Sequence, residues 1–191
     1  MFAPTLKSVF RKDLARSQAE TLHAALADQA RAPEFYAIAG APDTPEGRFD
    51  MLALHMFLVI DRLRREAPET DRLVRLLQEV FFERLDAALR EMGVGDLSVG
   101  RKIRALAEAF YGRYSAYERS VAGDIADGAG ALEEAIARNV LGTDDASRAK
   151  PLADYARAAR EKLIAAPIDA LEAAIADLGP LSRSAVARGT I

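Results

Sequence analysis

The chain has 191 residues, of which 50% are hydrophobic and 29% are charged, and its formal net charge is −3. This mix excludes a disordered chain, and the length favours one globular domain, residues 1–191, with a sizeable core. The absence of cysteine excludes disulfides, thiolate nucleophiles and cysteine-ligated metal centres, and the charge gives no overall attraction to nucleic acid.

Apolar residues recur at helical spacing along the whole chain, whereas strict alternation is rare. The sequence therefore predicts an all-α fold, a single-domain bundle of about seven to nine helices. The predicted helices cover residues 5–16, 18–31, 45–65, 70–92, 98–120, 132–141, 152–165 and 168–178, with a short helical turn and a loop within 31–47. Residues 121–130 (VAGDIADGAG) are predicted to form a loop and residues 179–191 a flexible tail.

The first predicted helix has an apolar side ringed by basic residues, as in helices that lie on a membrane surface. Asp13 interrupts that apolar side, and docking of the helix onto the rest of the domain is the alternative interpretation. No signal peptide is predicted, and the most apolar run, residues 51–60, is too short to span a bilayer. The candidate membrane contacts are Phe2, Leu6, Lys7, Phe10 and Arg11.

The helix predicted over residues 45–65 has apolar residues on two opposite sides. One stripe comprises Phe49, Leu52, Met56, Val59, Ile60 and Leu63, and the other comprises Met51, Leu54 and Leu58. Such a helix is normally central and buried. The alternative is that the second stripe forms an open groove for an apolar partner helix, flanked by His55 and Arg62.

Three glycines followed by two basic residues (residues 93–102, GVGDLSVGRK) raise the question of a phosphate-binding loop. Arg101 and Lys102 stand where a Walker A loop needs lysine and a hydroxyl residue, and a helical pattern precedes the glycines where a dinucleotide-binding loop needs a strand. We therefore interpret the segment as a turn between two antiparallel helices, with Gly93 ending the first helix.

In the helix predicted over residues 98–120, Lys102 and Arg113 border the apolar stripe, Tyr111 projects to its side, and Gly112 lies away from the core. A glycine beside an aromatic side chain is suited to close approach by another backbone, so this flank is a candidate contact site. The alternative is that Tyr111 packs against a neighbouring helix of the same domain.

The candidate groups for catalysis are few. His23 and His55 lie on separate predicted helices, and we expect the first at the surface and the second hydrogen-bonded near the core. Asp43 and Asp96 are interpreted as loop and cap residues. We predict no enzyme activity, no cofactor and no metal site.

Two long segments, APEFYAIAGAPDTPEGRFDMLALHMFLVIDRLRRE and VFFERLDAALREMGVGDLSVGRKIRALAEAFYGRYSAY, occur in this order and resemble the ubiquinol–cytochrome c chaperone family. The resemblance covers residues 31–117, and the helices predicted beyond residue 128 are based on periodicity alone. The residues that carry it are Phe35, Tyr36, Pro42, Asp43, Thr44, Gly47, Arg48, Phe49, His55, Arg62, Leu63, Glu91, Gly93, Gly95, Asp96, Gly100, Lys102, Phe110, Tyr111, Gly112 and Arg113.

This resemblance implies a non-enzymatic assembly factor that binds newly made cytochrome b and helps to build the quinol–cytochrome c oxidoreductase (bc₁) complex. The mitochondrial relatives work with a small partner protein and the ribosome, and the short N-terminus resembles a bacterial member. We expect a cytoplasmic protein, peripheral at the inner face of the cytoplasmic membrane, with no direct nucleic-acid readout. The alternative function is a peripheral membrane-associated helical interaction module with a different client.

Placed beside the helical patterns, the resemblance yields one set of candidate residues for client or partner binding. Its members lie on the two helices that carry the family motifs. They are Arg48, Met51, Leu54, His55, Leu58, Arg62, Lys102, Tyr111 and Arg113.

Overall fold

The computed structural model describes residues 6–127, 130–179 and 181, and it describes the helical backbone alone for residues 6–13 and 124–127. The described part is helical and contains no strand, which confirms the all-α prediction. Its elements are α1 (Leu6–Ala30), α2 (Pro33–Ala37), α3 (Pro45–Arg64), α4 (Asp71–Glu91), α5 (Asp96–Asp127), α6 (Ala131–Ile136) with a π-helical turn (Ala137–Leu141), a 3₁₀ turn (Ala146–Ala149), α7 (Lys150–Ala165), a second 3₁₀ turn (Ile168–Ala170) and α8 (Leu171–Ala176).

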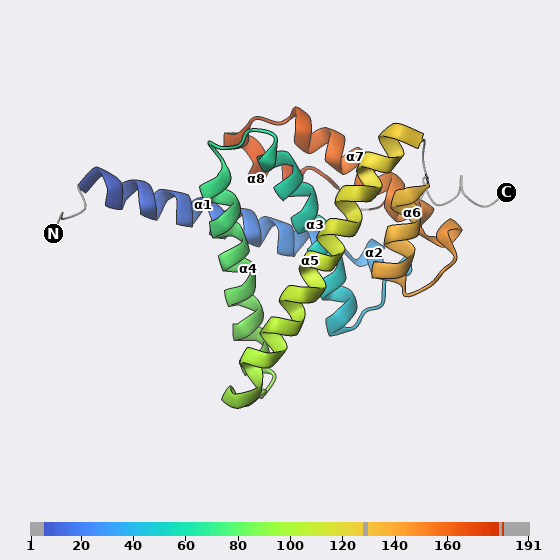
Figure 1. Cartoon of the computed structure of the whole chain (residues 1–191), viewed down its shortest axis with the longest axis horizontal. Coiled ribbons are helices and arrows are strands. Elements are labelled where there is room, and N and C mark those ends of the chain that lie inside the picture. Colours follow the sequence, from blue (N-terminus) through green and yellow to red (C-terminus); the bar gives the residue numbers. More distant parts are fainter. Residues whose placement is uncertain (1–5, 128–129, 180, 182–191) are drawn as a thin grey trace.

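Helix α3 lies at the centre of the bundle and contacts α1, α4, α5 and α7 (Figure 1). Helices α4 and α5 form a long antiparallel hairpin whose turn extends beyond the other helices at the bottom of the view. The C-terminal helices α7 and α8 cover the upper side, and α8 also packs against α1. Within the described ranges, no helix has both the length and the apolar character that a membrane crossing requires.

Two predicted boundaries are wrong. Helix α1 is continuous, although two helices over 5–16 and 18–31 were expected, because no proline or glycine stands between them. Helix α5 extends to Asp127 through most of the predicted loop 121–130. Gly123 lies in this part of the helix, but a single glycine destabilises a helix by only about 1 kcal/mol, and packing of α5 on α6 offsets that cost. Of the predicted tail, Leu181 is buried in the core, and residues 180 and 182–191 lie outside the described part, so their flexibility stays a prediction.

The start of α3 is fixed by local contacts that only glycine permits. Thr44 caps the helix by accepting a hydrogen bond from the Gly47 N–H at 3.1 Å, and Pro45 occupies the first helical position. The preceding loop presses so closely on this turn that a Cβ at Gly47 would lie 2.0 Å from the Pro42 carbonyl oxygen. A side chain at residue 47 would therefore force the loop away from α3.

A buried hydrogen-bond network ties α3 to α7 and α1. His55 Nδ1 lies 2.8 Å from the Met51 carbonyl oxygen, which can only accept, so Nδ1 carries the proton. The neutral ring then accepts at Nε2 from the Tyr155 hydroxyl at 2.9 Å. Gln29 Nε2 donates to Tyr155 at 3.0 Å and to the Gly179 carbonyl oxygen at 2.7 Å. Burial lowers the pKa of His55 to about 4, so the ring is neutral at pH 7.

The end of α3 is joined to the end of α7 by a buried arginine. Arg62 donates from Nε and Nη2 to the Ala166 carbonyl oxygen at 3.2 and 2.8 Å, and from Nη2 to Glu66 at 2.7 Å. The guanidinium thus satisfies a carbonyl just beyond the C-terminus of α7, where positive charge is favourable. The positive charge of the buried Arg62 side chain therefore has both a carbonyl and a carboxylate partner.

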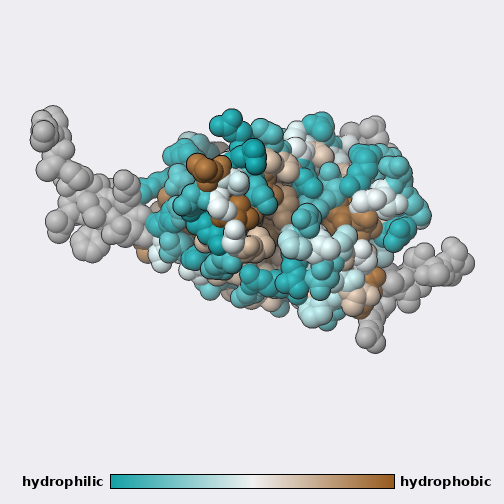
Figure 2. Space-filling view, turned by 90° about the horizontal axis from the view of Figure 1, so that it is seen from below, coloured by the Kyte–Doolittle hydropathy of each residue, from teal (hydrophilic) through white to brown (hydrophobic). Residues whose placement is uncertain are grey.

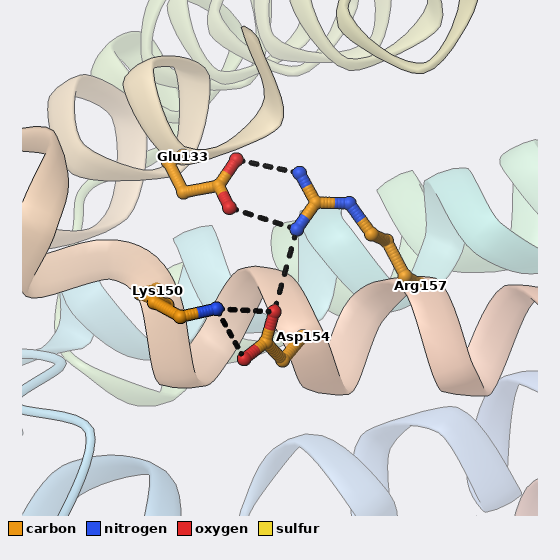
Figure 3. Close-up of polar contacts among 4 residues, drawn as sticks. All are labelled: Glu133, Lys150, Asp154 and Arg157. Carbon is orange, nitrogen blue, oxygen red and sulfur yellow. Dashed lines mark hydrogen bonds and ion pairs between the residues drawn. The ribbon is translucent and has the colours of Figure 1, made fainter. Parts of the chain in front are cut away.

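Helices α6 and α7 are joined by a bidentate ion pair between Arg157 and Glu133 (Figure 3). Arg157 donates to both carboxylate oxygens of Glu133, at 2.8 and 2.5 Å, and lies 3.5 Å from Asp154. Lys150 holds Asp154 from the preceding turn at 3.0 Å. The hydrogen bonds from Arg157 lower the pKa of Glu133, so this carboxylate stays ionised and the pair persists near neutral pH.

The first prediction concerns Gly47. Because its Cβ would meet backbone, Gly47→Ala should lower the free energy of unfolding by about 2 to 3 kcal/mol. The matched control is Gly112→Ala on α5, where an added Cβ meets no atom within 4 Å of the described chain. That control should raise the free energy of unfolding by about 0.5 to 1 kcal/mol. Urea denaturation of both variants checks this, and equal effects would contradict the close contact.

The second prediction concerns pH. The pKa of His55 in the folded chain, about 4, is below that of the unfolded chain, so the folded state binds fewer protons and loses stability as pH falls from about 6.5 to about 4. His23 acts in the same sense, whereas Asp50, whose pKa burial raises to about 6, acts in the opposite sense. Urea denaturation at several pH values should therefore show a smaller pH dependence in His55→Gln than in the wild type. An unchanged dependence would mean that His55 is not the titrating group.

Candidate functional site

Five of the nine residues predicted to bind a client or partner are buried, namely Met51, Leu54, His55, Leu58 and Arg62. Both apolar stripes of α3 are filled by neighbouring helices, so the hypothesis of an open groove along α3 is wrong. The sequence could not decide this, because a central helix and a grooved helix have the same two-sided pattern. His55 and Arg62 instead link α3 to α7, as described above.

The other four candidates, Arg48, Lys102, Tyr111 and Arg113, reach the surface. Arg48 lies at the start of α3, where it pairs with Asp43 at 2.7 Å and lies 6.0 Å from the Tyr36 ring. The remaining three lie on α5. Among the described residues, Arg48, Lys102 and Tyr111 share no hydrogen bond, ion pair or ring contact with one another, so these candidates do not form one compact cluster.

Arg113 joins α5 to α3. Its Nε lies 2.7 Å from Asp50 Oδ1, and its guanidinium lies 5.4 Å from the centre of the Phe49 ring. The ion pair is bent, because within the described chain neither of these two atoms has a hydrogen-bond partner of good geometry, and the buried Tyr117 hydroxyl also lacks one. Burial raises the pKa of Asp50 to about 6, although Arg113 opposes the rise.

A row of aromatic rings leads from this crossing to the surface. Phe49 stacks on Phe81 at 6.1 Å, and Phe81 packs on Phe110 at 5.0 Å. Tyr111 is the exposed end of the row, 5.2 Å from Phe110 and 6.2 Å from Phe82 of α4. The ring packs on α4, as the alternative interpretation expected, and is still 49% exposed, so the contact site stays a prediction.

The turn of α5 beside Tyr111 is open. An added Cβ at Gly112 would meet no atom within 4 Å of the described chain, so packing inside the domain does not require a glycine there. Glycine nevertheless weakens the helix by about 1 kcal/mol relative to alanine. An exposed aromatic ring beside such a glycine is the geometry that allows another backbone to come close.

Lys102 and Arg113 lie on one line of α5. They are eleven residues apart, which is about three helical turns, and the partly buried Leu106 and Ala109 lie between them on the same side. Because Arg113 points to α3, this line faces the space beside α3. Figure 2 shows a hollowed apolar strip between hydrophilic borders on the lower face of the molecule. Tyr111 lies on the other flank of α5, about 180° from Lys102 on the helical wheel, and Gly112 lies between the two flanks on the exposed side. We name Lys102, Tyr111, Gly112 and Arg113 the α5 surface, which therefore spans both flanks of the exposed side of the helix.

The glycine-rich segment forms the turn between the antiparallel helices α4 and α5 and the start of α5, as the sequence predicted. The Val94 N–H donates to the Leu89 carbonyl oxygen at 3.0 Å and the Gly93 N–H to that of Arg90 at 2.9 Å, which closes the end of α4. Gly93 has a φ of 82°, in the left-handed region. Asp96 forms an ion pair with Arg90 across the turn.

Several predictions about other surfaces have different outcomes. Phe2 lies outside the described residues, and Leu6, Lys7, Phe10 and Arg11 lie where only the helical backbone of α1 is described, so the membrane contacts remain predictions. The expectation that His23 lies at the surface is wrong. This side chain is buried beside Phe81 and burial lowers its pKa to about 4. In the described part, no group of three or more His, Asp or Glu could hold a metal ion.

Sequence reasoning missed Asp50, Tyr155 and the exposed side chains Met92 and Leu97 at the hairpin turn. Leu97 could have been found, because it lies about 200° from Val99 on the helical wheel and therefore off the buried stripe. Asp50 and Tyr155 gave no local signal, since their partners are 63 and 100 residues away in the chain.

The chain was compared with known proteins. The family model described as ubiquinol–cytochrome C chaperone matches residues 38–178. The crystal structure of the Cbp3 homolog from Brucella abortus superimposes with a TM-score of 0.73 at 33% sequence identity, covering 94% of this chain and 97% of that one.

A curated relative, ubiquinol-cytochrome-c reductase complex assembly factor 1 from Xenopus laevis, is 24% identical over 126 residues. That match covers 65% of this chain and 61% of the relative, so the chain spans less than two thirds of that relative's length. The family model covers most of this chain and matches the family to which the sequence motifs pointed. The chain belongs to the ubiquinol–cytochrome c chaperone family.

Proposed function

We propose that this chain is a non-enzymatic assembly chaperone that binds newly made cytochrome b and assists assembly of the bc₁ complex. Its family, of ubiquinol–cytochrome c chaperones and bc₁ assembly factors, supports the class of function. The observation that carries the proposal is the α5 surface, where the exposed Tyr111 lies beside the open Gly112.

The chemistry of the client favours such a surface. Cytochrome b is a bundle of apolar helices, and a helix held before its own bundle is complete needs an apolar contact with polar edges. Tyr111 offers a large ring whose orientation is already restricted by contacts with Phe82 and Phe110. Binding a client therefore costs little further side-chain entropy. Gly112 allows the client backbone to approach, and Arg113, on the flank of α5 opposite Tyr111, places positive charge at the edge of the contact. Lys102 lies about three turns away on the same flank as Arg113.

Arg113 has a further part in this proposal. It is held by Asp50 and the Phe49 ring at the α3 crossing, so its guanidinium is positioned before a client arrives. A preorganised side chain binds with a smaller entropy loss than a free one. Arg48, at the start of α3, is retained as a separate candidate, held by Asp43 and Tyr36.

We place the proposed activity in the cytoplasm, at the inner face of the membrane into which the client is inserted. A small helical partner protein and the ribosome, which the resemblance to mitochondrial relatives implies, are further partners of this proposal. Affinity capture of the tagged chain from gently solubilised host membranes, with quantification of cytochrome b against mature bc₁ subunits, tests the client. Enrichment of cytochrome b alone is expected, and equal capture of many membrane proteins would overturn the proposed specificity.

The third prediction locates the client contact. Gly112→Leu places a bulky side chain where the client backbone should approach, and Tyr111→Ala removes the anchoring ring. Each change should reduce captured cytochrome b about fivefold or more, because each removes a contact worth about 1 kcal/mol or more. The melting temperature of Gly112→Leu should not fall, since an added Cβ at Gly112 meets no atom within 4 Å of the described chain and leucine favours a helix. That of Tyr111→Ala should fall slightly, since the ring packs on Phe82 and Phe110.

Gly100→Leu is the matched control. Gly100 is also an exposed glycine of α5 with no atom within 4 Å of an added Cβ, but it lies about three turns from Gly112. This variant should capture cytochrome b as the wild type does. If Gly112→Leu binds normally, or if both glycine variants lose binding equally, the contact does not lie at the α5 surface.

A further inference from the structure

The turn between α4 and α5 forms an exposed apex. In Figure 1 it is the lowest part of the molecule, beyond the ends of the other helices. Figure 2 views the molecule from below, and on this side apolar side chains are framed by hydrophilic ones. We name this region, residues 90–104, the hairpin apex; it is distinct from the α5 surface except for Lys102.

Two large apolar side chains at the apex have no packing role that accounts for them. Leu97 is 102% exposed and Met92 is 59% exposed. They are two of the four large hydrophobic side chains that are exposed in the described chain, and they stand on either side of one short turn. Single exposed apolar residues are normal, but two at the tip of a projecting hairpin indicate a contact with an apolar phase.

The charges behind the tip are unbalanced. Arg101, Lys102 and Arg104 are exposed, and no ion pair between described residues includes them. On the same helix, Asp96 is paired with Arg90, and the exposed Glu108, one turn after Arg104, forms no ion pair with these cations among the described residues. The apex contains four basic and two acidic residues, although the whole chain has a net charge of −3. This local excess of positive charge is suited to an anionic surface.

The spacing of the two features matches a bilayer interface. Residues 101–104 follow Leu97 by four to seven positions, so the cations lie about 6 to 10 Å behind the leucine along the helix axis. They also project in different directions around α5, which makes a collar rather than a stripe. Interfacial segments bury apolar side chains about 5 to 10 Å below the headgroups, which leaves such a collar at the level of the phosphates.

We propose that the hairpin apex docks this chain onto an anionic membrane surface. Leu97 and Met92 enter the boundary between headgroups and acyl chains, and Arg101, Lys102 and Arg104 bind lipid phosphates. This attachment goes beyond the proposed binding of cytochrome b and needs no client. It also differs from the membrane contact predicted for residues 2–11, since it uses the turn between α4 and α5.

The test uses the purified full-length chain and lipid vesicles without any client. Flotation should show binding to vesicles of phosphatidylcholine with phosphatidylglycerol and much weaker binding to phosphatidylcholine alone. Raising the salt concentration should weaken binding, since exposed charges are screened. The double variant M92S/L97S should bind about tenfold more weakly, because it removes two apolar side chains from the interface.

The charge variant R101E/R104E should also bind at least about tenfold more weakly, because it replaces two basic residues near the anionic surface with acids. Lys102 is left unchanged, because it also belongs to the α5 surface. All four substituted side chains are exposed, so the melting temperatures of both variants should equal that of the wild type.

The matched control F10S/L14S changes two apolar residues on the predicted membrane side of α1, where Leu14 is 71% exposed. This variant should bind vesicles as the wild type does. Loss of binding in F10S/L14S with normal binding in M92S/L97S would overturn the proposal and assign attachment to α1. The proposal is also overturned if the wild type binds no anionic vesicle, or if M92S/L97S loses captured cytochrome b while vesicle binding is unchanged, which would make the apex a protein contact.

Discussion

The burial of α3 on every side is the constraint on which the other helices depend. A helix that is apolar on two opposite sides is stable only when other helices cover both. The three buried polar side chains of α3 each contact a different segment. Asp50 pairs with Arg113 of α5, His55 accepts a hydrogen bond from Tyr155 of α7, and Arg62 donates to the Ala166 carbonyl oxygen just after α7. Because an unpaired polar group is costly in a core, these pairings set how the surrounding helices lie along α3. The cap at Thr44 and the contact at Gly47 then fix where α3 begins.

The helices were predictable from the sequence because periodicity and capping act over a few residues. Thr44 and Pro45 marked the start of α3, and Gly93 marked the end of α4. The predictions from sequence failed where contacts between distant segments outweighed the local sequence pattern. The glycine and aspartates after residue 120 resemble a loop, yet packing against α6 keeps α5 helical to Asp127. His23 looked like a surface residue, since nothing nearby in the chain shows that Phe81 covers it.

The candidate site was only partly predictable, and for a different reason. The family motifs marked His55, Arg62, Tyr111 and Gly112 alike, but the first two are core links and the last two reach the surface. A motif records which residues matter, not whether they matter for folding or for contact with a partner. Only the three-dimensional arrangement separates the two groups, because the partner of His55 is 100 residues away in the chain.

The length of α5 has a mechanical consequence. Its 32 residues make a rod of about 48 Å, so a tilt of roughly 5° displaces one end by about 4 Å relative to the other. The hairpin apex, Tyr111 and the crossing of Arg113 over Asp50 all lie on this one rod. A force applied at the apex therefore acts with a long lever arm on the crossing with α3, which serves as the fulcrum. Anchoring of the apex would hold the α5 surface at a set height and orientation above whatever anchors it.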